Sequence, residues 1–105
     1  DVLDLFSGTG NIAFEFASRG AEKVVCVEKF DPCIRFIQKH ALKFNLEEVL
    51  QVRKQDVFNF LKSHHHQYNI IFADPPYDSS DFPVIPQLVI KNNLLTIILE
   101  YQIKL

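Results

Sequence analysis

The chain has 105 residues, of which 48% are hydrophobic and 23% charged, and its formal net charge is −2. This length allows one domain, the composition is that of a soluble globular protein, and the net charge gives the whole chain no general attraction for nucleic acid. We expect a cytoplasmic protein, because no apolar run approaches the roughly 20 residues of a membrane span and the first residues do not form a signal-peptide pattern.

Short apolar runs alternate with longer amphipathic stretches along the chain. The runs predict five strands, over Val2–Phe6, Val24–Val27, Val49–Val52, Ile70–Ala73 and Leu94–Leu99. The stretches "NIAFEFASRG", "DVFNFLKS" and "SDFPVIPQLVIKNN" predict helices, the first ending at Gly20 and the last starting near Ser80. In "DPCIRFIQKHALKFN" we expect Asp31 as the N-cap, Pro32 at the first helical position, and an apolar stripe of Ile34, Ile37, Ala41 and Phe44.

Strands that alternate with helices predict an α/β fold with a mainly parallel, doubly wound, Rossmann-like sheet. The apolar strands indicate that helices cover both faces of the sheet. We interpret residues 1–105 as one domain and, because both ends fall in or beside apolar strands, as the core of a longer protein. Such sheets bind ligands at the carboxyl ends of their strands, so the residues at those positions decide the function.

The first predicted strand is followed by a glycine-rich turn, "DLFSGTGN". Gly8 and Gly10 let the backbone turn tightly and bring its N–H groups against a ligand at the start of a helix. Extended to Ala13, "GTGNIA" also fits the G-x-G-x-x-A form of the dinucleotide-binding fingerprint. A glycine-rich turn without a ligand is the alternative.

Acidic residues follow the second and third predicted strands. Glu28 lies 20 residues after Gly8, where nucleotide-binding folds of this class place an acid that accepts hydrogen bonds from ribose hydroxyls. The alternative for Glu28 is a solvated side chain paired with Lys29. Asp56 either accepts a hydrogen bond from an adenine amino group, with the Val57 N–H serving a ring nitrogen, or only caps the following helix.

The fourth predicted strand ends in Asp74-Pro75-Pro76-Tyr77. A carboxylate and a backbone carbonyl that accept the two N–H bonds of a base's amino group pull its nitrogen towards tetrahedral geometry and align it with a methyl donor. The prolines fix the backbone so that the Pro75 carbonyl points inward, and Tyr77 offers a flat face on which an extruded base can stack. An ordinary Pro-Pro turn beside a partly buried tyrosine is the alternative.

Together these blocks resemble the class I S-adenosylmethionine (SAM)-dependent methyltransferases, and within them the RsmD-like 16S rRNA (guanine-N2)-methyltransferases. The resemblance is carried by "VLDLFSGTGNIAFEFASRGA", "VVCVEKFDPC", "QDVFNFL", "YNIIFADPPYD" and "IILEY". It implies the sheet of a SAM methyltransferase, here without the family's N-terminal segment and final hairpin. It also implies SAM as the methyl donor, methylation of a guanine N2 amino group, and small-subunit rRNA or the small ribosomal subunit as the partner.

The resemblance also assigns roles to residues. The methionine part of SAM would lie against Asp4 and the glycine-rich turn, the ribose against Glu28 and the adenine against Asp56, with Phe6 and Phe30 bordering the pocket. The residues expected at the cofactor are Asp4, Phe6, Gly8, Thr9, Gly10, Glu28, Lys29, Asp56 and Val57, and those expected at the reacting base are Asp74, Pro75, Pro76 and Tyr77.

Three other functions remain open. An adenine-N6 methyltransferase acting on DNA or RNA would use the same Asp-Pro-Pro-Tyr quartet. A nicotinamide-dependent oxidoreductase would use "GTGNIA" and Glu28 but leaves the quartet unexplained, and a SAM-binding remnant would hold the cofactor without turnover.

The remaining residue patterns favour ordinary structural roles. We expect a monomer without a metal site, because His64–His66 are consecutive loop residues that cannot all face one ion. Cys26 and Cys33 are expected to be reduced, inert thiols, and most of the ten phenylalanines to lie in the core.

Overall fold

One parallel sheet organises the protein, which we describe from a computed structural model of residues 1–63, 66–74, 84–91 and 95–101. Within these ranges the sheet has five strands in the order β3-β2-β1-β4-β5, and every neighbouring pair is parallel. The strands are β1 (Val2–Leu5), β2 (Val24–Glu28), β3 (Leu50–Lys54), β4 (Tyr68–Ala73) and β5 (Leu95–Tyr101). The strand order reverses at β1, so the predicted doubly wound fold is confirmed, with its switch point between β1 and β4.

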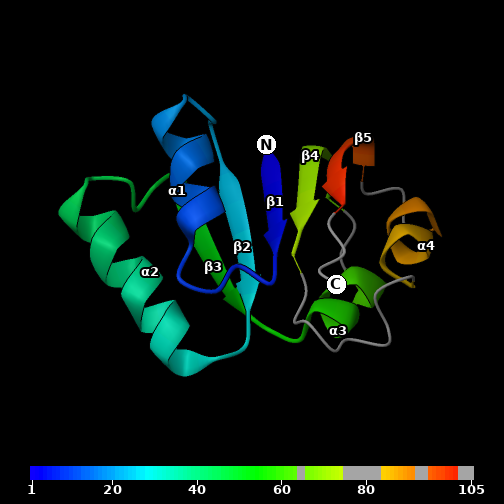
Figure 1. Cartoon of the computed structure of the whole chain (residues 1–105), viewed down its shortest axis with the longest axis horizontal. Helices are drawn as coiled ribbons and strands as arrows, with labels where there is room; N and C mark the ends of the chain where they lie inside the picture. Colours follow the sequence, from blue (N-terminus) through cyan, green and yellow to red (C-terminus); the bar gives the residue numbers. More distant parts are fainter. Residues whose placement is uncertain (64–65, 75–83, 92–94, 102–105) are drawn as a thin grey trace.

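Helices cover both faces of this sheet. The helices α1 and α2 lie on one side of the strands and α3 and α4 on the other (Figure 1). Their bounds are α1 (Asn11–Ser18), α2 (Asp31–Lys43), α3 (Val57–Ser63) and α4 (Val84–Lys91). Side chains of a strand alternate between the two faces. Val2 accordingly packs with Ala13 and Ala17 of α1, whereas Leu3 and Leu5 belong to the cluster formed with α3 and α4.

The start of α2 differs from the prediction. Phe30 occupies the N-cap position, and Asp31 is the first helical residue, so Asp31 does not cap the helix. Its carboxylate instead lies 2.8 Å from Lys54 Nζ at the end of β3. The Lys54 side chain lowers the pKa of Asp31, mainly through this hydrogen bond. A basic partner from a neighbouring strand therefore replaces the local interaction that the sequence favoured.

The expected core position of several aromatic side chains is also wrong. Ile34, Ile37 and Ala41 of α2 are buried as predicted, but Phe44 is exposed because the helix ends at Lys43. Phe36 is exposed as well, and so is Phe30, which was expected at the border of the cofactor pocket. The buried face of α2 thus consists of aliphatic side chains, and its rings face the solvent.

Other predictions agree with the fold. Gly20 follows α1 in a left-handed conformation with φ 99°, as expected of a glycine that ends a helix. Cys26 is buried and free, and Cys33 is free and half-buried. The predicted start of the last helix near Ser80 lies outside the described residues. None of the helices in the described part of the chain has the length and apolar character needed to cross a membrane.

Candidate functional site

The carboxyl ends of three adjacent strands lie at one level of the sheet. Leu5 at the end of β1 is in register with Val27 of β2 and with Ala73 of β4. The next residue along each chain segment therefore stands at the same edge, and these residues are Phe6, Glu28 and Asp74. The predicted convergence of strand ends is confirmed at this edge, beside the switch point.

A tight turn of left-handed residues joins β1 to α1. Phe6 and Gly8 both have φ 59°, and Gly10 has φ 86°. The turn is tied down by the Ser7 hydroxyl, which donates to the Asp4 carbonyl over 2.8 Å, and by the Gly10 N–H, which donates to the Ser7 carbonyl over 2.9 Å. Among the described residues, no side chain caps the helix that begins after Gly10. Its first N–H groups and the positive end of its dipole are therefore available to an anionic group.

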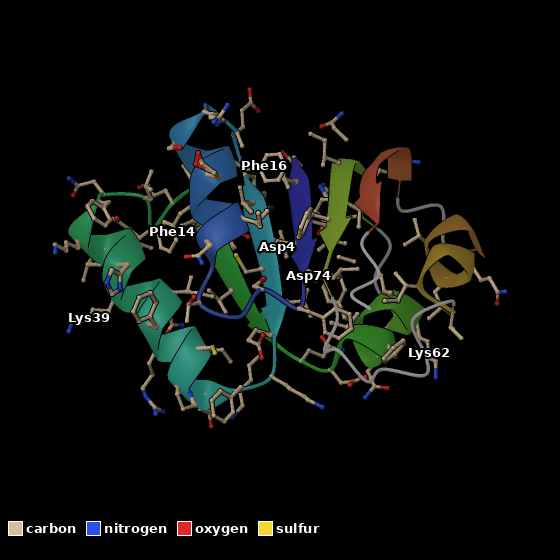
Figure 2. All side chains as sticks on the ribbon, viewed as in Figure 1. Asp4, Phe14, Phe16, Lys39, Lys62 and Asp74 are labelled. Carbon is tan, nitrogen blue, oxygen red and sulfur yellow. The ribbon has the colours of Figure 1, made fainter. Side chains whose placement is uncertain are left out.

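A pocket of about 370 Å³ opens between this turn and the end of β4. Asp4, Phe6, Gly8 and Thr9 line it from the β1 side, and Asp74 lines it from β4. The side chains of Asp4 and Asp74 come from neighbouring strands, as labelled in Figure 2. The structure thus gathers five of the predicted site residues around one cavity.

The pocket lining also contains four residues that the sequence did not single out, namely Ser7, Asn11, Ile12 and Phe72. The first three are part of the glycine-rich turn or the first turn of α1, so their proximity to the motif was the available signal. Phe72 has no such signal. Phe72 precedes Asp74 by two residues, so both side chains point to the same face of the sheet, and Phe72 therefore joins the lining.

The Asp4 carboxyl is buried beside the pocket, and its pKa is raised. Its side chain is 2% exposed, and Oδ2 has no hydrogen-bond partner among the described residues. Burial raises the pKa of the Asp4 carboxyl to about 7; the Ser7 hydroxyl offsets part of this effect, and the negative charges of Asp74 and Glu28 add to it. A ligand cation beside Oδ2 would supply the missing partner and favour the ionised form.

Backbone donors hold the Glu28 carboxylate in place. Oε1 accepts a hydrogen bond from the Gly8 N–H over 2.8 Å, and Oε2 accepts from the Lys29 and Phe30 N–H groups over 3.0 Å each. The alternative interpretation of Glu28 was a solvated side chain paired with Lys29. The structure shows instead a carboxylate held by three backbone N–H groups. A carboxylate has about four acceptor positions, so about one remains for a ligand hydroxyl in this arrangement.

The third predicted strand contributes less to the cavity. Asp56 Oδ2 accepts a hydrogen bond from the Asn59 N–H over 3.1 Å and so caps α3, and Val57 is buried in the core below. The link to the pocket is Phe6, whose ring meets Phe58 of α3 edge-on at 6.2 Å between centroids. Other residues predicted at the cofactor are not among the lining residues of the described pocket, namely Gly10, Glu28, Lys29, Phe30, Asp56 and Val57.

Three predicted residues of the reacting-base site, Pro75, Pro76 and Tyr77, lie outside the described residues. His64 and His65 do so as well, whereas His66 Nε2 lies 2.9 Å from Asp1 Oδ2. Over the part of the chain that the structure describes, no group of three or more His, Cys, Asp or Glu side chains is arranged to hold a metal ion. Burial raises the pKa of Cys26 to about 12, which keeps this thiol in its unreactive protonated form.

Comparison with known proteins gives a consistent picture. The family described as "Conserved hypothetical protein 95" matches residues 1–102. A ribosomal RNA small subunit methyltransferase D from Buchnera aphidicola is 36% identical over 93 residues, which cover 89% of this chain and 47% of that protein. The chain therefore spans about half the length of this relative.

Two further similarities are informative. A tRNA1(Val) (adenine(37)-N6)-methyltransferase from Serratia proteamaculans is 36% identical over 78 residues, covering 72% of this chain and 30% of that protein. The crystal structure of a Haemophilus influenzae protein, proposed to be a methylase, superimposes with a TM-score of 0.83 at 29% identity and covers 91% of this chain and 62% of that one.

Proposed function

Because the chain belongs to the Conserved hypothetical protein 95 family of RsmD-like class I methyltransferases, we propose that it is the catalytic core of a SAM-dependent RNA methyltransferase. The proposed target is the N2 amino group of a guanine in small-subunit rRNA. The observation that carries the proposal is the pocket at the switch point, where an uncapped helix N-terminus, the Asp4 carboxyl and Asp74 converge.

The pocket residues fit SAM in charge and in space. The N–H groups at the start of α1 suit a carboxylate, and the unpartnered Asp4 Oδ2 suits a cationic group, as the amino-acid part of SAM requires. A Cβ atom added at Gly8 would meet nothing within 4 Å, so a ligand can approach the backbone closely there. Glu28 has an acceptor position for a ribose hydroxyl, and Asp56 is proposed to face the adenine.

The proposed chemistry depends on how the protein holds the amino group of the base. The lone pair of that nitrogen is delocalised into the ring, so the nitrogen is a weak nucleophile. Asp74 and the Pro75 carbonyl would accept its two N–H bonds, which favours tetrahedral geometry and directs the lone pair towards the donor. SAM supplies, when bound, a methyl group on a positively charged sulfur, which keeps the electron pair of the breaking bond.

The amino group becomes acidic only as the new N–C bond forms, so Asp74 need not be a strong base. It would orient the nitrogen and then accept or relay the released proton. Tyr77 would stack on the base once the nucleotide is extruded. These roles require no metal ion.

A second target has a specific observation in its favour. The Serratia relative is named for adenine-N6 methylation of a tRNA, and the Asp-Pro-Pro-Tyr quartet suits an adenine amino group equally well. The longer and more complete match to the Buchnera enzyme, which is named for small-subunit ribosomal RNA, favours rRNA as the substrate, and guanine is proposed from the resemblance to the RsmD-like enzymes.

The test is methyl transfer by the protein in its full length. It is given labelled SAM with small ribosomal subunits, naked 16S rRNA, tRNA or DNA, and the modified nucleosides are separated by chromatography. Asp74→Ala is the active-site variant, and Glu47→Ala, which removes an exposed carboxylate after α2, is the matched control.

We expect N2-methylguanosine from the rRNA samples with wild type and Glu47→Ala, and its loss with Asp74→Ala. Detection of N6-methyladenosine instead would identify adenine, and not guanine, as the target. SAM binding without transfer to any of the four substrates would contradict the proposal and support a cofactor-binding remnant.

A further inference from the structure

The solvent face of α2 carries two adjacent rows of side chains. Positions four residues apart lie on one side of a helix, and positions one residue further along form the neighbouring row. The first row, the basic stripe, consists of Arg35, Lys39 and Lys43; the second, the aromatic stripe, consists of Phe36 and His40 of α2 and of Phe44 at its C-cap. Each stripe spans nine residues, which corresponds to a rise of about 12 Å along the helix axis.

The two phenylalanine rings of the aromatic stripe are exposed, and His40 between them is half-buried. Phe36 is 42% exposed and Phe44 is 56% exposed, although the other face of α2 already provides the aliphatic side chains that bury the helix. Phe36 stacks on His40 with 3.9 Å between centroids and 23° between planes, and His40 Nδ1 lies 2.9 Å from the Phe36 carbonyl. Lys43 Nζ lies 5.6 Å from the centre of the Phe44 ring.

The cations of the basic stripe are available. None of Arg35, Lys39 and Lys43 forms an ion pair within the described ranges, in contrast to Lys54, which is bound to Asp31. The Lys39 side chain points away from the sheet in Figure 2. The acids nearest to the stripe in sequence are Asp31, already paired, and Glu47 and Glu48 beyond the helix end. A chain with a net charge of −2 thus presents a local positive surface on this helix.

The location of α2 connects this face to the pocket. The helix begins directly after the end of β2, at the same sheet edge as the candidate site. Ile37 on its buried face lies next to the glycine-rich turn, since a Cβ atom at Gly10 would be 3.0 Å from Ile37 Cγ1. The outer face of α2 therefore belongs to a helix that packs against the turn bordering the pocket.

We propose that the basic and aromatic stripes of α2 bind single-stranded RNA next to the nucleotide that is methylated. This inference rests on the proposed function, because it assumes an RNA substrate. Cations spaced along a helix suit a chain of phosphates, and exposed flat rings suit unpaired bases, which stack on aromatic side chains with little sequence preference. Apolar rings alone would be enough to bind a protein partner. The row of cations without ion pairs beside them favours RNA, which is a polyanion.

Salt dependence tests the basic stripe. The full-length protein binds a fluorescent single-stranded rRNA fragment, and its affinity is measured between 50 and 200 mM salt. A plot of log affinity against log salt concentration has a negative slope. In the variant Arg35→Gln, Lys39→Gln, Lys43→Gln we expect this slope to become shallower by about 2, since each phosphate contact with a single strand contributes about 0.7. Over this fourfold salt range the wild type would then lose about 16-fold more affinity than the variant.

The control removes the same amount of charge elsewhere. Arg19→Gln, Lys23→Gln, Lys62→Gln changes cations at the far end of α1, before β2 and on α3, away from α2. We expect its salt slope to stay closer to that of the wild type. Equal slopes for the two triple variants would overturn the proposal, because the attraction would then come from net charge alone.

Ring removal tests the aromatic stripe. Phe36→Leu, Phe44→Leu keeps apolar surface but removes the flat faces, and we expect the affinity for the single strand to fall by about 5-fold or more at an unchanged salt slope. Unchanged affinity would overturn the stacking role. Sedimentation of the wild type as a dimer that Phe36→Ser, Phe44→Ser dissociates would also overturn it, since the face would then bind a second copy.

Methyl transfer by the wild-type protein is measured in parallel, so that the two proposals fail separately. Transfer to RNA together with no effect of the α2 variants on affinity would overturn the inference about α2 and leave the proposed function intact. RNA binding that depends on α2 without methyl transfer would support the stripes and contradict the proposed function.

Discussion

Replacing Asp4 by Asn is expected to stabilise the protein at neutral pH while weakening its site. The carboxyl is buried without a partner for Oδ2, and its pKa is raised from 3.8 to about 7. The folded state therefore binds the proton more tightly than the unfolded state does. The stability that the protonated Asp4 carboxyl contributes is fully present below pH 4 and is lost as the pH rises through 7. A pKa difference of about 3 corresponds to about 4 kcal/mol, a large share of the 5–15 kcal/mol that stabilises a typical domain.

Urea unfolding at a series of pH values measures this effect. The difference in unfolding free energy between Asp4→Asn and wild type should grow by about 4 kcal/mol between pH 4 and pH 7 and then stay constant, because the other titrating groups cancel in the comparison. SAM affinity should fall in the same variant, since the carboxylate is proposed to face a cationic group. Stability curves that run parallel from pH 4 to pH 8 would refute the reasoning.

Three further predictions concern the turn, the acid at the end of β2 and the cysteines. Gly10→Ala should destabilise the protein by about 1–3 kcal/mol more than Gly8→Ala in urea unfolding. Both positions have positive φ, but a methyl group at Gly10 would lie 3.0 Å from an isoleucine side chain whereas one at Gly8 meets nothing within 4 Å; the reverse order would contradict the packing argument. Glu28→Gln should reduce SAM affinity by about tenfold in a calorimetric titration, because the amide replaces one acceptor oxygen by donors; an unchanged affinity would remove Glu28 from the site. Iodoacetamide at pH 8 should alkylate Cys33 well before the buried Cys26, whose pKa is about 12; equal rates would contradict the burial of Cys26.

Much of the fold could be predicted because the apolar runs of the strands indicate both their secondary structure and their burial between helices. They are short, nearly continuous and separated by helical periodicity, which specifies a covered parallel sheet. The prediction failed where a distant partner replaced a local one. Asp31 has the chemistry of an N-cap, yet it pairs with Lys54 of β3. Phe44 continues the apolar spacing of α2, yet the helix ends one residue earlier.

The site was predictable to the extent that it follows from strand ends. Glycines after β1, an acid at the end of β2 and an acid after β4 converge because parallel strands end at one edge, and the register places Glu28 and Asp74 at the level of Phe6. The state of each group was not predictable. The raised pKa of Asp4 depends on burial between layers, and the three N–H donors of Glu28 come from the precise path of two loops. Neither property leaves a pattern in the sequence.

The central claim is that the pocket beside β1 binds a methyl donor and not a dinucleotide. Titration calorimetry of the full-length protein with SAM and with NAD⁺, under the same conditions, tests it most directly. We expect saturable one-to-one binding of SAM, weakened in Glu28→Gln, and no measurable binding of NAD⁺. Binding of NAD⁺ with no binding of SAM would contradict the proposed function and would favour an oxidoreductase in which the glycine-rich turn and Glu28 bind the dinucleotide.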